Sequence, residues 1–152
     1  MEMNDEIRIE APRARVYEAL NDPDILKECI PGCEELIKHS DTDLEAKVTL
    51  KIGPVKAKFG GKVTLDQSNA PGRFSLTGEG SGGVAGFAKG KADVELAEDG
   101  DATILSYAAK ADVGGKIAQL GSRLINSTAN RLAGQFFEKF RQEVEKESIS
   151  AD

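Results

Sequence analysis

The sequence predicts an α+β domain in which a curved antiparallel sheet wraps around one long C-terminal helix. Residues 44–113 alternate between apolar and polar side chains in successive runs separated by short turns, as antiparallel strands with one wet face do. Residues 116–146 lack proline and carry apolar side chains every three or four positions, the period of a helix. This helix is the only long amphipathic element available to cover the apolar face of the sheet.

Before the sheet, the chain predicts one strand and two short helices. Two isoleucines alternate with polar neighbours over residues 7–9, which indicates a strand with one buried face. A helix follows over residues 12–21. Asp22 and Pro23 then predict a second short helix through residue 26, because Asp caps helices well and Pro suits the first turn.

Six further strands are predicted from the alternation and from Gly, Pro, Asn and Asp turns between the runs. They cover residues 34–38, 44–52, 55–65, 74–78, 88–96 and 103–113. The glycine-rich bend at residues 80–86 joins two antiparallel strands and lacks a GK[ST] ending, so we do not interpret it as a phosphate-binding loop.

The inward positions of this predicted sheet are unusually small. They include Ala46, Ala57, Gly61, Gly78, Ala88, Gly90, Ala92, Ala109 and Ala111, and the helix contributes Gly121, Ala129, Ala133 and Gly134. Small residues on both sides permit either close packing of the layers or an apolar cavity. The cavity is favoured because a curved sheet does not touch a straight helix everywhere, and the chain has no Trp and only six Phe.

We predict that an apolar ligand binds in this cavity, although each lining residue also fits a plain core position. The predicted lining is Phe59, Phe74, Leu76, Phe87, Tyr107, Leu124, Leu132, Ala133, Phe136 and Phe140. Arg123 and Arg131, eight residues apart on the helix, are candidates for a polar handle on the ligand. The alternative is that both arginines extend along the helix edge to carboxylates of the sheet.

The composition describes an acidic globular chain. Its 152 residues include 20 Lys and Arg and 26 Asp and Glu, for a net charge of −6. Nucleic-acid binding depends on clustered basic residues, and no basic stripe is visible, so no nucleic-acid partner is expected. The same acidity predicts that membrane contact is transient or made through a partner protein.

One domain is expected over residues 1–147, with a disordered tail at residues 148–152. No signal peptide or spanning segment is recognisable, which favours a cytoplasmic location, with peripheral contact at the inner face of the membrane as an option. The spacing of Cys29 and Cys33 matches neither a CxxC pair nor a zinc site, so both are expected to be free thiols.

No catalytic residue, metal site or cofactor is predicted. His39 is the only histidine and lies at a strand end, where exposure is usual. A single histidine leaves no triad and no histidine-rich metal site, and no Asp or Glu falls cleanly in an inward strand register to supply paired carboxylates. The sequence therefore favours binding over catalysis.

A set of ordered motifs gives the chain a family resemblance. These motifs are residues 29–34 (CIPGCE), 51–55 (KIGPV), 59–61 (FGG), 82–90 (GGVAGFAKG), 114–123 (GGKIAQLGSR), Tyr107 and Phe136-Phe137. They resemble the CoxG family of carbon monoxide dehydrogenase subunits, a branch of the START-like, Bet v 1-like (SRPBCC) superfamily, and the match spans most of the length.

The resemblance implies a helix-grip fold with an apolar cavity. It also implies a role as an accessory to molybdenum hydroxylases of the carbon monoxide dehydrogenase type, in membrane attachment or in handling a quinone or lipid. Two functions stay open: a carrier for a hydrophobic molecule, and a module that docks on the hydroxylase and assists its maturation or placement. A cyclase or hydrolase activity, also found in the superfamily, is disfavoured because an acid-base pair is missing.

Overall fold

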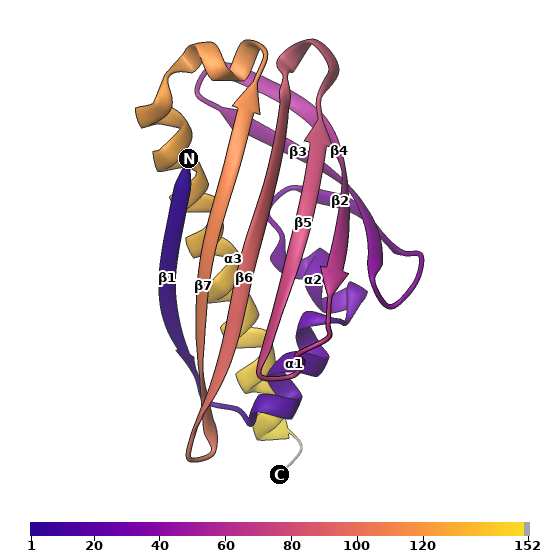
Figure 1. Cartoon of the computed structure of the whole chain (residues 1–152), viewed down its shortest axis with the longest axis vertical. Coiled ribbons are helices and arrows are strands. Elements are labelled where there is room, and N and C mark those ends of the chain that lie inside the picture. The colour runs from indigo at the N-terminus through magenta and orange to yellow at the C-terminus, as the bar shows by residue number, and fades with distance from the viewer. Residues whose placement is uncertain (151–152) are drawn as a thin grey trace.

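The computed structural model describes the backbone of residues 1–150 and the side chains of residues 1–146. Seven strands form one antiparallel sheet in the order β1-β7-β6-β5-β4-β3-β2. The strands are β1 (Glu2–Ile9), β2 (Cys33–Lys38), β3 (Asp43–Ile52), β4 (Val55–Asp66), β5 (Arg73–Ser81), β6 (Phe87–Asp99) and β7 (Ala102–Gly114). The predicted fold class is confirmed, and the long helix α3 (Ser122–Ser150) lies against one face of the sheet (Figure 1).

The two predicted short helices, α1 (Arg13–Leu20) and α2 (Pro23–Cys29), follow β1. The Asp22 carboxylate accepts hydrogen bonds from the backbone N–H groups of Asp24, at 2.9 Å, and Ile25, at 3.5 Å. Asp22 therefore caps α2 as predicted.

The C-terminal helix begins later than the sequence predicted. Residues 116–120 form a 3₁₀ turn, η2 (Lys116–Leu120), and α3 starts at Ser122. Gly121 separates them with φ of 95°, a left-handed conformation that does not fit within an α-helix. Helix α3 runs to Ser150, and the tail expected at residues 148–152, of which 151 and 152 lie outside the described residues, stays a prediction.

One end of the molecule holds the fully buried core. There the C-terminal half of α3 packs on α1, α2 and the ends of β1, β6 and β7. Its fully buried side chains are Ile9, Val16, Leu96, Leu105, Phe140 and Val144. The buried Thr103 hydroxyl donates a 2.8 Å hydrogen bond to the Ala11 carbonyl, which satisfies both groups within this core.

Several inward glycines allow neighbouring strands of the curved sheet to approach closely. A Cβ on Gly90 would lie 2.6 Å from the backbone oxygen of Lys110, and one on Gly61 would lie 3.3 Å from that of Glu79. The closest atoms thus belong to the neighbouring strand and not to α3. These glycines let adjacent strands approach at the bend, a role that the sequence alone did not suggest.

Candidate functional site

The candidate site is the part of the inner face that begins at Tyr107 and Phe136, which pack against the buried core, and continues away from that core. Phe59, Leu76 and Tyr107 lie in the inward register of β4, β5 and β7 and are half-buried. On α3, Leu132, Ala133 and Phe136 are also half-buried. The predicted lining is therefore only partly covered here, in contrast to the core. The apolar cavity itself stays a prediction.

Two residues of the predicted lining belong to the core. Phe74 is 7% exposed and Phe140 is fully buried, and both lie in the core cluster at the other end. Leu124 packs at the far end, where its Cδ2 would lie 2.7 Å from a Cβ on Gly53 in the turn between β3 and β4. Phe74 and Phe140 are therefore core residues, whereas Leu124 is half-buried beside the turn at Gly53.

Phe87 does not face the inner side, contrary to the prediction. It shares the outward register of β6 with Lys89, is 53% exposed, and its ring lies over Gly114 of β7. Successive side chains of a strand point to opposite faces, so the inward assignment of Ala88 already places Phe87 outside. The sequence alone contained the signal for this correction.

An aromatic row connects the core to the candidate site. The rings of Phe140 and Phe136 have centroids 5.8 Å apart, those of Phe136 and Phe137 are 5.0 Å apart, and Phe137 stacks on Tyr107 at 4.9 Å. Phe137 was absent from the predicted lining because it lies one residue outside the chosen helical period. These contacts hold the Tyr107 ring in place on the inner face.

The polar groups on the inner face differ from those predicted. Arg123 and Arg131 are both exposed. Asp5 instead falls in the inward register of β1, with Ile7 and Ile9, and is the cross-strand partner of Tyr107. Burial and the nearby Asp5 carboxylate raise the pKa of Tyr107, so its hydroxyl stays protonated at neutral pH.

The expectation that no Asp or Glu falls cleanly in an inward register is therefore wrong for Asp5, and the expectation that paired carboxylates are missing stays a prediction. Continuing the alternation of Ile7 and Ile9 towards the N-terminus would have identified Asp5. Lys38 also falls in an inward register, and its Nζ donates a 3.1 Å hydrogen bond to the Asn21 carbonyl.

Of the remaining candidate residues for chemistry, Cys33 falls in the inward register as the cross-strand partner of Val48, and Cys29 lies in the core cluster. His39 is exposed, with its Nε2 at 2.9 Å from the Glu45 carboxylate, and this contact lowers the pKa of Glu45. Cys29 and Cys33 are free thiols. Within the described residues, no group of three or more His, Cys, Asp or Glu side chains is arranged to hold a metal ion.

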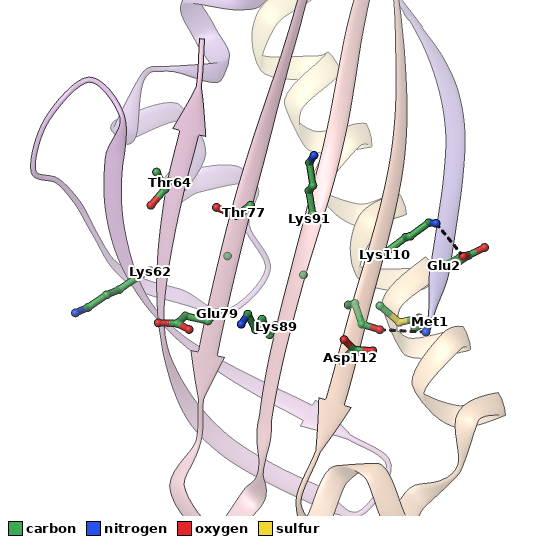
Figure 2. A pocket seen from close by; sticks show the side chains of 13 residues that line it. Met1, Glu2, Lys62, Thr64, Thr77, Glu79, Lys89, Lys91, Lys110 and Asp112 are labelled. Atoms are coloured by element: carbon green, nitrogen blue, oxygen red, sulfur yellow. Dashed lines mark hydrogen bonds and ion pairs between the residues drawn. The ribbon is translucent and has the colours of Figure 1, made fainter. Parts of the chain in front are cut away.

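A hollow of about 700 Å³ opens on the outer face of the sheet (Figure 2). Charges of opposite sign alternate across its strands, from Lys62 on β4 through Glu79 and Lys89 to Asp112 on β7. The hollow is open and lined by charged side chains and threonines. It therefore does not fit an apolar ligand.

None of the helices within the described residues combines the length and apolarity that crossing a membrane requires.

Comparisons with known proteins relate most of the chain to one family. Residues 6–145 match the CoxG family of carbon monoxide dehydrogenase subunits. No curated protein matches the chain at a significant level. A conserved protein from Geobacillus kaustophilus, of known crystal structure, is 30% identical with a TM-score of 0.89, and the alignment covers 96% of each chain.

Two more distant structures share the fold. A STAR-related lipid transfer protein from Xanthomonas axonopodis is 21% identical with a TM-score of 0.64, over 94% of this chain and 85% of that one. The Zhui aromatase/cyclase from Streptomyces sp. R1128 is 12% identical with a TM-score of 0.68, over 96% of this chain and 94% of that one. The fold is thus the START-like, Bet v 1-like fold predicted from the sequence.

Proposed function

Because the chain belongs to the CoxG family of carbon monoxide dehydrogenase subunits, we propose that it binds a hydrophobic molecule between α3 and the sheet. The ligand would be a quinone or another lipid. The observation that carries this proposal is the contrast along the inner face. Large side chains such as Phe140 and Leu105 close one end completely, while Phe136, at the edge of that core, and Phe59 and Leu132, beyond it, remain only half-buried. Incompletely covered apolar side chains are typical of ligand sites.

The proposed ligand has an uncharged head group. Asp5, whose side chain is exposed, and Tyr107 are cross-strand partners on the inner face, and the Tyr107 hydroxyl is a hydrogen-bond donor at neutral pH. A carboxylate ligand would meet the Asp5 charge, whereas a quinone carbonyl or a lipid hydroxyl accepts the Tyr107 proton without that repulsion.

We further propose that the protein is a non-catalytic accessory of a molybdenum hydroxylase of the carbon monoxide dehydrogenase type, in the cytoplasm or at the inner face of the membrane. The family assignment supports this role. The alternative is a module that docks on the hydroxylase, or recruits it to a membrane, without a ligand. A cyclase or hydrolase activity is less favoured: the Zhui aromatase/cyclase shares the fold, but Asp5, the carboxylate beside Tyr107 in the inward register, is exposed and is not held in an enclosed site.

Solvent extraction of gently purified protein, followed by mass spectrometry against a blank, tests the ligand directly. A stoichiometric quinone or lipid is expected. An empty extract, together with no uptake of added short-chain ubiquinone, would contradict ligand binding and favour the docking module. A pull-down of hydroxylase subunits by the empty protein would then identify that module.

The substitution Ala133→Trp tests the location of the site. Ala133 is half-buried on α3, so an indole there would occupy the proposed cavity and lower uptake of short-chain ubiquinone at least tenfold. Gln135→Trp is the matched control, because Gln135 is exposed on the same helix and its variant should bind normally. Unchanged uptake by a folded Ala133→Trp variant would contradict this site.

A further inference from the structure

Charge is segregated along the chain. Residues 46–65, 80–92 and 113–137 contain ten of the 20 Lys and Arg residues and none of the 26 Asp and Glu residues. A chain with a net charge of −6 thus has three long segments that carry only positive charge. The acidic residues all lie in the rest of the sequence.

The fold brings the turns of these three segments to one end of the molecule (Figure 1). The turn at Gly53 packs against Leu124 at the start of α3. In the bend between β5 and β6, which includes the 3₁₀ turn η1 (Gly83–Ala85), Gly86 packs against Ile117 of η2. The start of α3 therefore lies beside the turns of the sheet, at the end where the inner face is half-covered.

Some of the positive charges of these segments are paired with carboxylates, and others are not. Lys47 and Lys58 form ion pairs with Glu35 and Glu34 of β2, at 3.4 and 3.6 Å. Four other cations are exposed, and within the described residues none of them has a carboxylate at ion-pair distance. These are Lys51, Lys56, Lys116 and Arg123. We call these four residues, together with the exposed Val84 described next, the cationic end.

An apolar side chain projects from the same end. Val84, at the tip of the bend between β5 and β6, is 94% exposed. Phe87, three residues further on, is 53% exposed. The only other large hydrophobic side chain exposed to this degree among the described residues is Ile37, on the edge strand β2.

We propose that the cationic end docks on an anionic lipid bilayer, with Val84 entering the headgroup region. The proposal rests on the proposed function, because a bilayer is where a quinone or lipid ligand is taken up or released. Clustered Lys and Arg bind anionic headgroups, and an exposed apolar side chain among them enters the interface. The acidic remainder is repelled by the same surface, so the molecule docks end-on.

The observations favour a bilayer over a protein partner. Protein interfaces bury a broad patch, roughly 800 Å² per partner, around aromatic anchors. Here Val84 projects alone from a narrow glycine-rich tip, while the ring of the partly exposed Phe87 lies back over Gly114 of β7. The cations lie on separate turns of the same end. This arrangement suits a fluid surface of dispersed negative charge.

Cosedimentation of the whole protein with vesicles tests the proposal. Vesicles of phosphatidylcholine alone are compared with vesicles that contain phosphatidylglycerol, at low and at physiological salt. Binding is expected to rise with the phosphatidylglycerol fraction and to fall with salt. The pair Lys51→Glu and Lys56→Glu should weaken binding at least tenfold, and Val84→Ser about threefold. Lys27→Glu and Ile37→Ser, at exposed positions elsewhere, are the matched controls and should bind as the unaltered protein does.

Uptake of short-chain ubiquinone from solution, measured on the same variants, separates this proposal from the proposed function. Loss of vesicle binding with normal uptake in the cationic-end variants supports the docking surface. Absence of vesicle binding by the unaltered protein overturns it, as does equal binding to neutral vesicles or equal loss in the control variants. Salt-sensitive binding to immobilised polyglutamate without vesicle binding would overturn it in favour of an acidic protein partner. Vesicle binding without ligand uptake would leave the docking surface intact and contradict the proposed function instead.

Discussion

At the end of the molecule where α1 and α2 meet the sheet, Phe140, Val144 and Leu105 have no exposed surface. Towards the other end of the same helix and sheet, Leu132 and Phe59 are only half-buried. The first end is closed by two additional helices and by large side chains. The second has small inward residues and only turns to cover it. The same sheet and helix thus form a closed, stabilising core at one end and leave apolar surface available for binding at the other.

The largest difference between the two ends is expected when one apolar side chain at each end is truncated to alanine. Phe140→Ala should lower the free energy of unfolding by about 3–5 kcal/mol, because it leaves a cavity in a close-packed core. Leu132→Ala should cost less than half as much, since its side chain is already partly exposed. Urea denaturation of both variants measures the difference. Equal losses would mean that the two ends are packed alike.

Glycine substitutions test what keeps the second end open. In Gly90→Ala the new Cβ would lie 2.6 Å from the Lys110 carbonyl oxygen, so the sheet must shift and stability should fall by about 1–3 kcal/mol. The control is Gly134→Ala, where no atom lies within 4 Å of the new Cβ. That variant should gain about 0.5–1 kcal/mol from helix propensity. A neutral Gly90→Ala would contradict the role of this glycine in the curl of the sheet.

The reactivity of the two thiols tests the closure of the core end without changing the sequence. Burial raises the pKa of Cys29 to about 11, with a smaller contribution from Glu143, whereas Cys33 is half-buried and Lys27 opposes the rise of its pKa. At pH 8 a disulfide reagent should modify Cys33 at least tenfold faster than Cys29 in the folded protein, and both equally in urea. Comparable rates in the folded protein would show that the core end opens readily.

Because of the raised pKa of the Cys29 thiol, we expect the stability of the protein to depend on pH in the alkaline range. Because the pKa of Cys29 is higher in the folded protein than its ordinary 9.0, its contribution is complete below pH 9. That contribution is lost as the pH rises from 9 towards 11. Urea denaturation across this range should show a decline that is smaller in Cys29→Ala.

Much of the fold could be read from local patterns. The alternation in residues 44–113 identified the strands of the meander, and Asp22-Pro23 identified the start of α2. The start of α3 was placed too early, because the apolar period of residues 116–120 also fits a 3₁₀ turn and the left-handed Gly121 is not marked by composition. Local periodicity specifies faces better than it specifies boundaries.

The candidate site was predictable only in part. The register of each strand placed Phe59, Leu76 and Tyr107 on the inner face. Register did not show that Phe74 and Phe140 lie in the closed core, because depth along a strand or helix depends on what covers it. The sequence also did not show that Arg131 is exposed, because its position on the helix was compatible with facing the predicted cavity.

By itself the sequence determined the antiparallel sheet, the covering helix, the family and the three segments without acidic residues. Those properties follow from side-chain period and from residue identity, which are local. Only the tertiary structure decided which apolar residues are closed off, that glycines at the curl pack on neighbouring strands, and that the turns of the three segments without acidic residues meet at one end. Burial and the summed field of distant charges depend on which segments meet in space, and that is set by strand pairing between residues far apart in the chain.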